Sequence, residues 1–242
     1  MNYRNKISVS VMCSDLLALG NDIRRLEALG ADMLHIDVMD AHFVPNLTFG
    51  PDFIKAMQGF SKLPADCHFM VTDPELMLSK VQMRPGDFFS VHAELCEGGG
   101  RVVPGELFSA DGRPVRSYAA MADAVHAQGG LFGIVLNPET PVEALEPNLS
   151  TLDTVTLMLV HPGAAGAKMV DGIMEKVGVL RKWLDARGLE RVEISVDGSV
   201  SAERARYMTG LGASIFVGGS AGIYIKGRSL EETIPEFREK IS

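Results

Sequence analysis

Two aspartates stand at the ends of two separate apolar runs of this sequence, each among groups that could hold a metal ion or move a proton. Asp37 lies near the end of the run that starts at Met33, and Asp197 follows the run that starts at Val192. Side chains of a β-strand alternate between its two faces, so His35 and Asp37 point the same way. Burying such polar groups in an apolar strand needs compensation. The pattern therefore indicates metal coordination, acid–base chemistry or both.

Polar residues also stand at the ends of most other apolar runs. They are Ser10, His68, His92, Asn137, His161 and the stretch Gly218-Gly219-Ser220. His68, together with His35, Asp37 and Asp197, makes a set of two imidazoles and two carboxylates, which are suitable ligands for one divalent ion. Such a mixed nitrogen and oxygen set suits Zn²⁺, Fe²⁺, Mn²⁺ or Co²⁺. Strand position alone leaves a metal-free polar site as an open alternative.

Short apolar runs alternate with helix-like segments along the whole chain. The runs predicted as strands are residues 7–12, 33–38, 65–71, 87–91, 131–136, 154–160, 192–196 and 214–217. Most are nearly continuously apolar and rich in valine and isoleucine, as parallel strands covered on both faces are. Capping residues and a three-to-four-residue apolar spacing predict helices at residues 14–29, 168–187, 201–209 and 230–241.

Eight strands with intervening helices, at about thirty residues per unit, predict an α/β fold, a single (β/α)₈ TIM barrel. An open doubly wound sheet uses the same units. Its dinucleotide fingerprint is absent from the sequence, because Gly98-Gly99-Gly100 does not follow a strand and open a helix. We therefore expect residues 1–242 to form one barrel domain, with an insertion loop at about 96–116 after the fourth strand. A substrate lid and a hairpin with no role in chemistry are both consistent with that loop.

Small residues fill the loops after the last three predicted strands, at residues 161–167, 197–199 and 218–222. Glycine and alanine let backbone N–H groups approach an anion closely, and barrels commonly bind phosphate at these loops. We therefore expect a phosphorylated small molecule across the barrel mouth. Two carboxylates that face this molecule could remove a proton from the carbon beside a carbonyl group and return it. A metal would stabilise the enediolate oxygens.

The composition restricts the classes of partner and the compartment. The chain has 242 residues, of which 46% are hydrophobic, and a formal net charge of −8. This charge argues against a nucleic-acid surface and against an anionic membrane surface. Cys13, Cys67 and Cys96 lack metal-motif spacing and are expected to be reduced thiols. Neither a signal segment nor an apolar run of membrane-spanning length is visible, so a cytoplasmic location is expected.

Several stretches of the sequence resemble the ribulose-phosphate 3-epimerase family. They are Ile7-Ser8-Val9-Ser10, Leu34-His35-Ile36-Asp37-Val38-Met39-Asp40-Ala41-His42-Phe43-Val44-Pro45-Asn46, Cys67-His68-Phe69-Met70-Val71, Leu136-Asn137-Pro138-Glu139-Thr140-Pro141 and Val196-Asp197-Gly198-Ser199. The resemblance covers nearly the whole chain in the right order, and the long stretch from His35 to Asn46 is its most specific part.

That family consists of metal-dependent (β/α)₈ barrels that invert the C3 stereocentre of ketose phosphates. The resemblance implies that Asp37 and Asp197 are the acid/base residues, and that both, with His35 and His68, bind the metal. It implies a substrate-binding set of Ser10, Met39, Met70, Met158, Gly163, Ala164, Ala165, Gly166, Gly198, Ser199, Gly219 and Ser220. The methionines are also consistent with plain core filling. The resemblance further implies a homo-oligomer, and it leaves the role of His92 open.

The sequence departs from the family in the loop that starts at Pro162. Where the family usually has Pro-Gly-Phe-Gly-Gly-Gln, this chain has Pro162-Gly163-Ala164-Ala165-Gly166-Ala167. Backbone donors survive this change, whereas the aromatic and amide side chains that would help close the loop do not. Alanine at position 164 predicts a wider mouth, and residues 137–144 with Ser199 resemble D-allulose-6-phosphate 3-epimerases slightly more than the pentose enzymes.

Several functions therefore remain open on the sequence. D-ribulose 5-phosphate, D-allulose 6-phosphate and another ketose phosphate are candidate substrates of an epimerase. A non-catalytic sugar-phosphate sensor is an alternative, and the intact Asp37 and Asp197 weigh against it. A barrel decarboxylase or aldolase is a further alternative, although a Schiff-base aldolase needs a strand-end lysine that the eight runs lack.

Overall fold

A computed structural model describes residues 4–95, 117–163 and 166–242. Its eight parallel strands follow one another around a closed barrel in sequence order, and β8 pairs with β1. The strands are β1 (Lys6–Ser10), β2 (Met33–Met39), β3 (Ala65–Met70), β4 (Phe88–His92), β5 (Leu131–Leu136), β6 (Thr154–Met158), β7 (Glu193–Asp197) and β8 (Ile215–Gly218). The closed order confirms the predicted (β/α)₈ barrel and excludes the open sheet.

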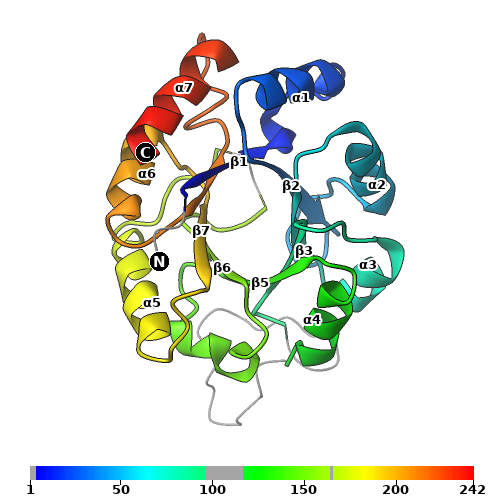
Figure 1. The fold of residues 1–242 in the computed structure, drawn as a ribbon, viewed down its shortest axis with the longest axis vertical. Helices are drawn as coiled ribbons and strands as arrows, with labels where there is room; N and C mark the ends of the chain where they lie inside the picture. Colours follow the sequence, from blue (N-terminus) through cyan, green and yellow to red (C-terminus); the bar gives the residue numbers. More distant parts are fainter. Residues whose placement is uncertain (1–3, 96–116, 164–165) are drawn as a thin grey trace.

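Helices surround the strands on the outside of the barrel (Figure 1). They are α1 (Leu19–Ala28), α2 (Pro51–Phe60), α3 (Pro74–Lys80), α4 (Ala119–His126), α5 (Glu175–Asp185), α6 (Ala202–Thr209) and α7 (Leu230–Ile241), with short 3₁₀ helices η1 (Val11–Cys13) and η2 (Val142–Asn148). The predicted insertion at about 96–116 lies outside the described residues, so one domain across all 242 residues stays a prediction.

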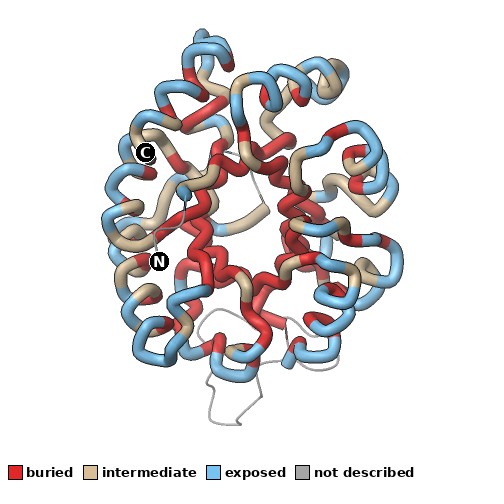
Figure 2. Tube along the Cα trace, in the orientation of Figure 1, coloured by how far each residue is buried: buried red, intermediate tan, exposed pale blue. Residues whose placement is uncertain are grey.

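The main hydrophobic core lies between the outer faces of the strands and the inner faces of the helices. Figure 2 shows the strands almost wholly buried, whereas the helices expose their outer faces. Inside the barrel, Met33, Phe88 and Ile215 pack with Leu131 in a small separate cluster, and all four are the first residues of their strands. This cluster closes the end of the barrel at which the strands begin. The other end, where the strands finish, is left for polar side chains.

The seam between the first and last strands is tied by α7. Lys6 pairs with Ile215 in the β1–β8 register, and its backbone N–H donates to the carbonyl oxygen of Ser214 at 2.8 Å. From α7, the guanidinium of Arg238 donates to the carbonyl oxygens of Asn5 at 2.8 Å and Gly30 at 2.9 Å. Because Arg238 contacts the segments before and after α1, the last helix holds the first strand in place.

Two predicted helices begin later than the sequence indicates. α1 starts at Leu19 rather than at residue 14, because the Ser14 hydroxyl bonds to the Tyr224 hydroxyl and the Asp15 side chain caps a local turn. α5 starts at Glu175 rather than at residue 168, because Gly172 has a φ of 74°, which an α-helix excludes. The predicted bounds of α7 are confirmed, and its Ser229–Glu232 capping box explains the sharp start.

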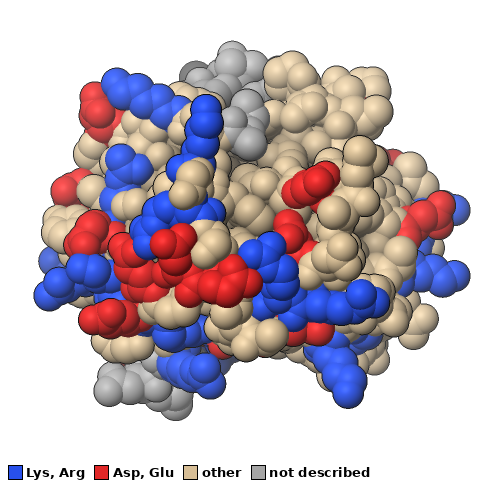
Figure 3. Space-filling view, turned by 90° about the horizontal axis from the view of Figure 1, so that it is seen from above, with Lys and Arg blue, Asp and Glu red and all other residues tan. Residues whose placement is uncertain are grey.

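Charged side chains of both signs lie on the face of the molecule that Figure 3 presents. Figure 3 shows acidic and basic side chains side by side on the face it presents, rather than a field of one sign. Among the described residues, none of the helices combines the length and apolarity needed to span a bilayer.

Candidate active site

Four of the residues at strand ends direct their ligand atoms to one point. Asp37 Oδ1 lies 3.2 Å from His35 Nε2 and 3.3 Å from His68 Nδ1. Asp197 Oδ2 lies 3.6 Å from each of the same two nitrogen atoms. These atoms lie within 4.8 Å of one another, although they come from β2, β3 and β7. The structure thus brings together all four residues that the sequence singles out as metal ligands.

This cluster fits a divalent metal ion. Two atoms each about 2.1 Å from a tetrahedral ion are about 3.4 Å apart, which matches the distances between the carboxylate oxygens and the imidazole nitrogens. His68 Nδ1 is buried, and within the described part of the chain it makes no hydrogen bond. A buried polar atom without a hydrogen bond is costly unless another ligand meets it. The spacing of the ligand atoms and the unbonded His68 Nδ1 therefore indicate the same position for an ion.

Opposite charges also stabilise the cluster when protons take the place of the ion. Burial alone would lower the pKa of His35, but the negative charges of Asp37, Asp66 and Asp197 raise its pKa well above the ordinary value. Burial would also lower the pKa of His68. The nearby carboxylates of Asp197 and Asp37 have the larger effect, so the pKa of His68 is raised as well. Burial would raise the pKa of Asp37, but the two histidines lower it.

Metal affinity is therefore expected to fall as the pH is lowered. Because the pKa values of His35 and His68 are raised, each ring takes up its second proton at a higher pH than an ordinary imidazole does. An ion must displace that proton, and each displaced proton weakens apparent affinity by up to about tenfold per pH unit below the pKa. Zn²⁺ titrations against a competing chelator, from about pH 8 to about pH 6, measure the slope. Calorimetry in two buffers of different ionisation enthalpy counts the released protons. An affinity that does not change with pH would contradict the raised pKa values.

Each metal-facing histidine is held from behind by a second set of buried groups. His35 Nδ1 lies 2.8 Å from Asp66 Oδ2, which also accepts the Ser8 hydroxyl at 2.7 Å. His68 Nε2 lies 2.8 Å from His92 Nε2, and His92 Nδ1 lies 2.9 Å from Glu94 Oε2. Asp66 and Glu94 were missed by the sequence reasoning. Their signal is the two-residue spacing Asp66–His68 and His92–Glu94, the same spacing that pointed to His35 and Asp37.

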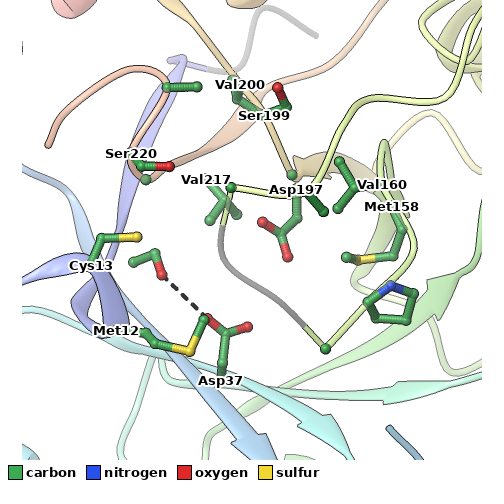
Figure 4. Close-up of a pocket in the computed structure, with 18 of the residues that line it drawn as sticks. Met12, Cys13, Asp37, Met158, Val160, Asp197, Ser199, Val200, Val217 and Ser220 are labelled. Carbon is green, nitrogen blue, oxygen red and sulfur yellow. Dashed lines mark hydrogen bonds between the residues drawn. The ribbon is translucent and has the colours of Figure 1, made fainter. Parts of the chain in front are cut away.

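A cavity opens above the metal-ligand cluster at the end of the barrel where the strands finish. Asp37 and Asp197 reach into it from opposite walls and direct their carboxyl groups toward each other, and the Ser10 hydroxyl donates to Asp37 Oδ2 at 3.2 Å (Figure 4). The predicted substrate residues that line it are Ser10, Met39, Met70, Met158, Gly163, Gly166, Gly198, Ser199, Gly219 and Ser220. Ala164 and Ala165 lie outside the described residues. Met12 and Cys13 also line the cavity and were not predicted.

His161, a polar strand-end residue, lies away from both the metal-ligand cluster and this cavity. β6 ends at Met158, two residues earlier than predicted, and the His161 side chain is exposed. Its Nε2 lies 2.6 Å from Glu139 Oε1 on the loop after β5. The expectation that every strand-end residue would converge on one mouth is wrong for His161, because three residues of loop carry it away from the strand.

Side-chain contacts fix two of the small-residue loops. Ser199 has a φ of 54°, and Arg204 holds it by donating to its carbonyl oxygen at 2.6 Å and its hydroxyl at 2.8 Å. The Asn46 amide donates to the carbonyl oxygen of Gly163 at 2.9 Å. A Cβ at position 163 would lie 2.9 Å from Cβ of Val44, so glycine is needed for this close approach. The loops after β6 and β7 are thus held beside the cavity.

Comparison with known sequences gives consistent matches over most of the chain. The model of the Ribulose-phosphate 3 epimerase family matches residues 6–104 and 110–224. A ribulose-phosphate 3-epimerase of Bacillus subtilis (strain 168) is 36% identical over 216 residues, which is 89% of this chain and 91% of that protein. One from Rhodobacter capsulatus is 34% identical, covering 93% of this chain and 88% of that protein. One from Schizosaccharomyces pombe is 33% identical, covering 98% and 93%.

Two solved structures with the same architecture are much more distant in sequence from this chain. A crystal structure of 3-hexulose-6-phosphate synthase superposes with a TM-score of 0.56 at 14% identity, covering 98% of this chain and all of that one (100%). Tryptophan synthase of Mycobacterium tuberculosis gives a TM-score of 0.59 at 12% identity, covering 98% of this chain and 93% of that one. At such identities the likeness shows the barrel fold alone.

Proposed function

This chain belongs to the ribulose-phosphate 3-epimerase family, and on that premise we propose that it is a metal-dependent 3-epimerase of a ketose phosphate. The proposed substrates are of the D-ribulose 5-phosphate or D-allulose 6-phosphate type. The observation that carries the proposal is the pair of carboxylates, Asp37 on β2 and Asp197 on β7, which face one cavity from opposite walls. The relatives of this chain named above are isomerases that act on carbohydrate phosphates.

Inversion at C3 needs a base on one face of the substrate and an acid on the other. In the proposed reaction one carboxylate accepts the C3 proton, the electrons of the C–H bond move into the carbonyl group, and an enediolate forms. The other residue, protonated at that stage, then delivers its proton to the opposite face of C3. One C–H bond breaks and one forms, so the two aspartates exchange protonation states in each turnover. When bound, the divalent ion supplies positive charge that stabilises the enediolate oxygens.

The remaining site residues receive proposed roles from their places in the cavity. His35, Asp37, His68 and Asp197 would hold the ion, which we propose to be Zn²⁺, Fe²⁺, Mn²⁺ or Co²⁺. Ser10 would orient Asp37 and contact the substrate, and Met39, Met70 and Met158 would cover the sugar. The loops that contain Gly163 to Gly166, Gly198 with Ser199, and Gly219 with Ser220 would hold the phosphate through backbone N–H groups.

Solvent deuterium exchange tests the reaction most directly. A ketose phosphate incubated with the enzyme in D₂O is expected to gain deuterium at C3 while its epimer accumulates, and chelation of the metal is expected to stop both. NMR follows exchange and inversion in the same sample. Binding of the sugar phosphate without exchange would contradict the proposed epimerase and support a non-catalytic sugar-phosphate sensor.

The sequence predicts that the hexose phosphate is turned over at least as well as the pentose phosphate. Alanine at position 164, where the family usually has phenylalanine, removes bulk from the loop after β6; this residue lies outside the described residues, so the prediction depends on sequence alone. The kcat/KM values for D-allulose 6-phosphate and D-ribulose 5-phosphate measure the preference. The variant Ala164→Phe is the matched control and is expected to shift the ratio toward the pentose. A strong wild-type preference for the pentose would overturn the prediction.

A further inference from the structure

Behind the metal-ligand cluster, a line of buried groups leads from His68 to a carboxylate that does not reach the cavity. His68 Nε2 contacts His92 Nε2 at 2.8 Å, and His92 Nδ1 contacts Glu94 Oε2 at 2.9 Å. The two imidazole rings lie nearly parallel and meet at their edges, with centroids 5.0 Å apart and planes at 26°. His68, His92 and Glu94 are each 1% exposed. Neither His92 nor Glu94 lines the cavity, so neither can contact the substrate there.

We propose that Glu94 and His92 are positioning residues that set the tautomer of His68, so that its Nδ1 presents a lone pair to the metal ion. This inference rests on the proposed metal-dependent function and assigns to it two residues outside the set of metal ligands. The line from Glu94 through His92 to His68 is called the His68 relay below.

The polarity of the His68 relay follows from its hydrogen bonds. Glu94 Oε1 accepts the backbone N–H of Asn137 at 2.8 Å and the Thr140 hydroxyl. Glu94 Oε2 then accepts from His92, so the proton of a neutral His92 ring lies on Nδ1. His92 Nε2 is left as an acceptor, and the single proton between the two rings must lie on His68 Nε2. A neutral His68 therefore has its free lone pair on Nδ1, which is the buried atom that faces Asp37 and Asp197.

The carboxylate state of Glu94 is supported by its surroundings. Burial would raise the pKa of Glu94, but hydrogen bonds and charge from His92, with those from Thr140 and Asn137, lower it. The Lys176 ammonium on α5 donates to the carbonyl oxygens of Asn137 at 3.2 Å, Pro138 at 2.9 Å and Thr140. Lys176 thus fixes the loop that supplies both other donors to Glu94.

His35 can be compared with His68, because the two rings turn different nitrogen atoms toward the metal-ligand cluster. Its Nδ1 faces Asp66 and its Nε2 faces the metal-ligand cluster, whereas His68 turns Nδ1 to the cluster and Nε2 to His92. The carboxylate of Asp66 sets the His35 tautomer directly. For His68 the carboxylate is one imidazole further away, so His92 must transmit the preference. Partners of this kind commonly change metal affinity by about 10- to 100-fold.

The variant Glu94→Gln tests the relay because it keeps the shape and reverses the polarity. The glutamine oxygen must face the Asn137 N–H, which only donates, so its NH₂ group faces His92 Nδ1. His92 would then carry its proton on Nε2, and His68 would be driven to protonate Nδ1. We expect the variant to bind Zn²⁺ about 10- to 100-fold more weakly than the wild type in chelator competition, and to show an altered visible spectrum with Co²⁺.

The variant Thr140→Val is the matched control. It removes one donor to Glu94 Oε1 but leaves the Asn137 N–H and the carboxylate facing His92, so its Zn²⁺ affinity is expected to equal that of the wild type. Equal affinity of Glu94→Gln and wild type would overturn the relay. Equal weakening of both variants would overturn it as well, because the effect would then come from packing. If the wild type binds no divalent ion, the proposed metal-dependent function fails first, and the relay loses its role with it.

A measurement on the wild type needs no variant to fold. Long-range ¹H–¹⁵N correlation spectra of the Zn²⁺-loaded protein distinguish ring nitrogens with and without a proton. The expected result is a proton on His92 Nδ1, a proton on His68 Nε2 and none on His68 Nδ1. A proton on His92 Nε2, or coordination of the ion by His68 Nε2, would overturn the proposal even if every variant behaved as expected.

Discussion

The substitution Asp197→Asn is expected to lower kcat for epimerisation by about 10²- to 10⁴-fold, the range of a lost general acid or base. Asparagine keeps an oxygen that can face an ion but cannot take up or release the proton at C3. The same loss is expected for Asp37→Asn, because each aspartate would serve one face of the substrate. Initial rates for both epimers, with metal content measured in each preparation, give the size of the effect.

The two variants should differ from each other in deuterium exchange. In each, the remaining carboxylate can still exchange the C3 proton of the epimer that it faces, so one epimer gains deuterium without inversion. Asp37→Asn and Asp197→Asn should therefore label opposite epimers. Asp185→Asn, on the exposed side of α5, serves as a charge-matched control and should retain full activity. If both variants labelled the same epimer, or labelled both at the wild-type rate, a two-base reaction across the cavity would be excluded.

Removal of the divalent ion is expected to lower kcat by about 10²- to 10⁴-fold, because several kcal/mol of charge stabilisation at the enediolate would be lost. The chain itself supplies little positive charge at this point, since Asp37 and Asp197 offset the two histidines. Dialysis against a chelator, followed by addition of Zn²⁺, Mn²⁺, Co²⁺ or Fe²⁺ in separate samples, measures the loss and identifies the ions that restore activity.

Circular dichroism before and after dialysis separates this effect from unfolding. A parallel chelation of Asp37→Asn, already slowed, should produce a smaller further change than in the wild type, because the two losses affect the same transition state. Full activity in protein that holds no divalent ion by elemental analysis would contradict the metal-dependent reaction.

Much of the barrel could be predicted from the sequence because its strands are covered on both sides. Continuous apolar runs place β5 at Leu131–Leu136 with its observed bounds, and place the other strands within two residues. Helix starts were harder, because serine and aspartate cap turns as readily as helices, as Ser14 and Asp15 do. Helices α2, α3 and α4 were not predicted, although proline at the first position of α2 and of α3, Pro51 and Pro74, is typical of a helix start.

In the candidate site, too, some residues could be predicted from the sequence and others could not. His35, Asp37, His68 and Asp197 could be predicted because strand ends converge on one face of a barrel and the alternation of side chains is strict. Glu94 carries the same two-residue spacing from His92, but the spacing alone does not reveal its role, because that role depends on donors from the loop after β5, which lies some forty residues later in the chain. His161 was misplaced for the converse reason: the length of a strand decides which way its last residues point, and the apolar run continued past the end of β6.

The seam between β1 and β8 determines when during folding the site can exist. The metal-facing residues lie on β2 and β3 on one side of this seam and on β7 on the other. Pairing of the first strand with the last joins residues about two hundred positions apart, and contacts between such distant segments form late because loop closure costs entropy. Before β1 pairs with β8, therefore, the metal-facing residues of β2 and β3 are not held beside Asp197 of β7. Activity should return during refolding in a single phase, at the rate at which the seam closes.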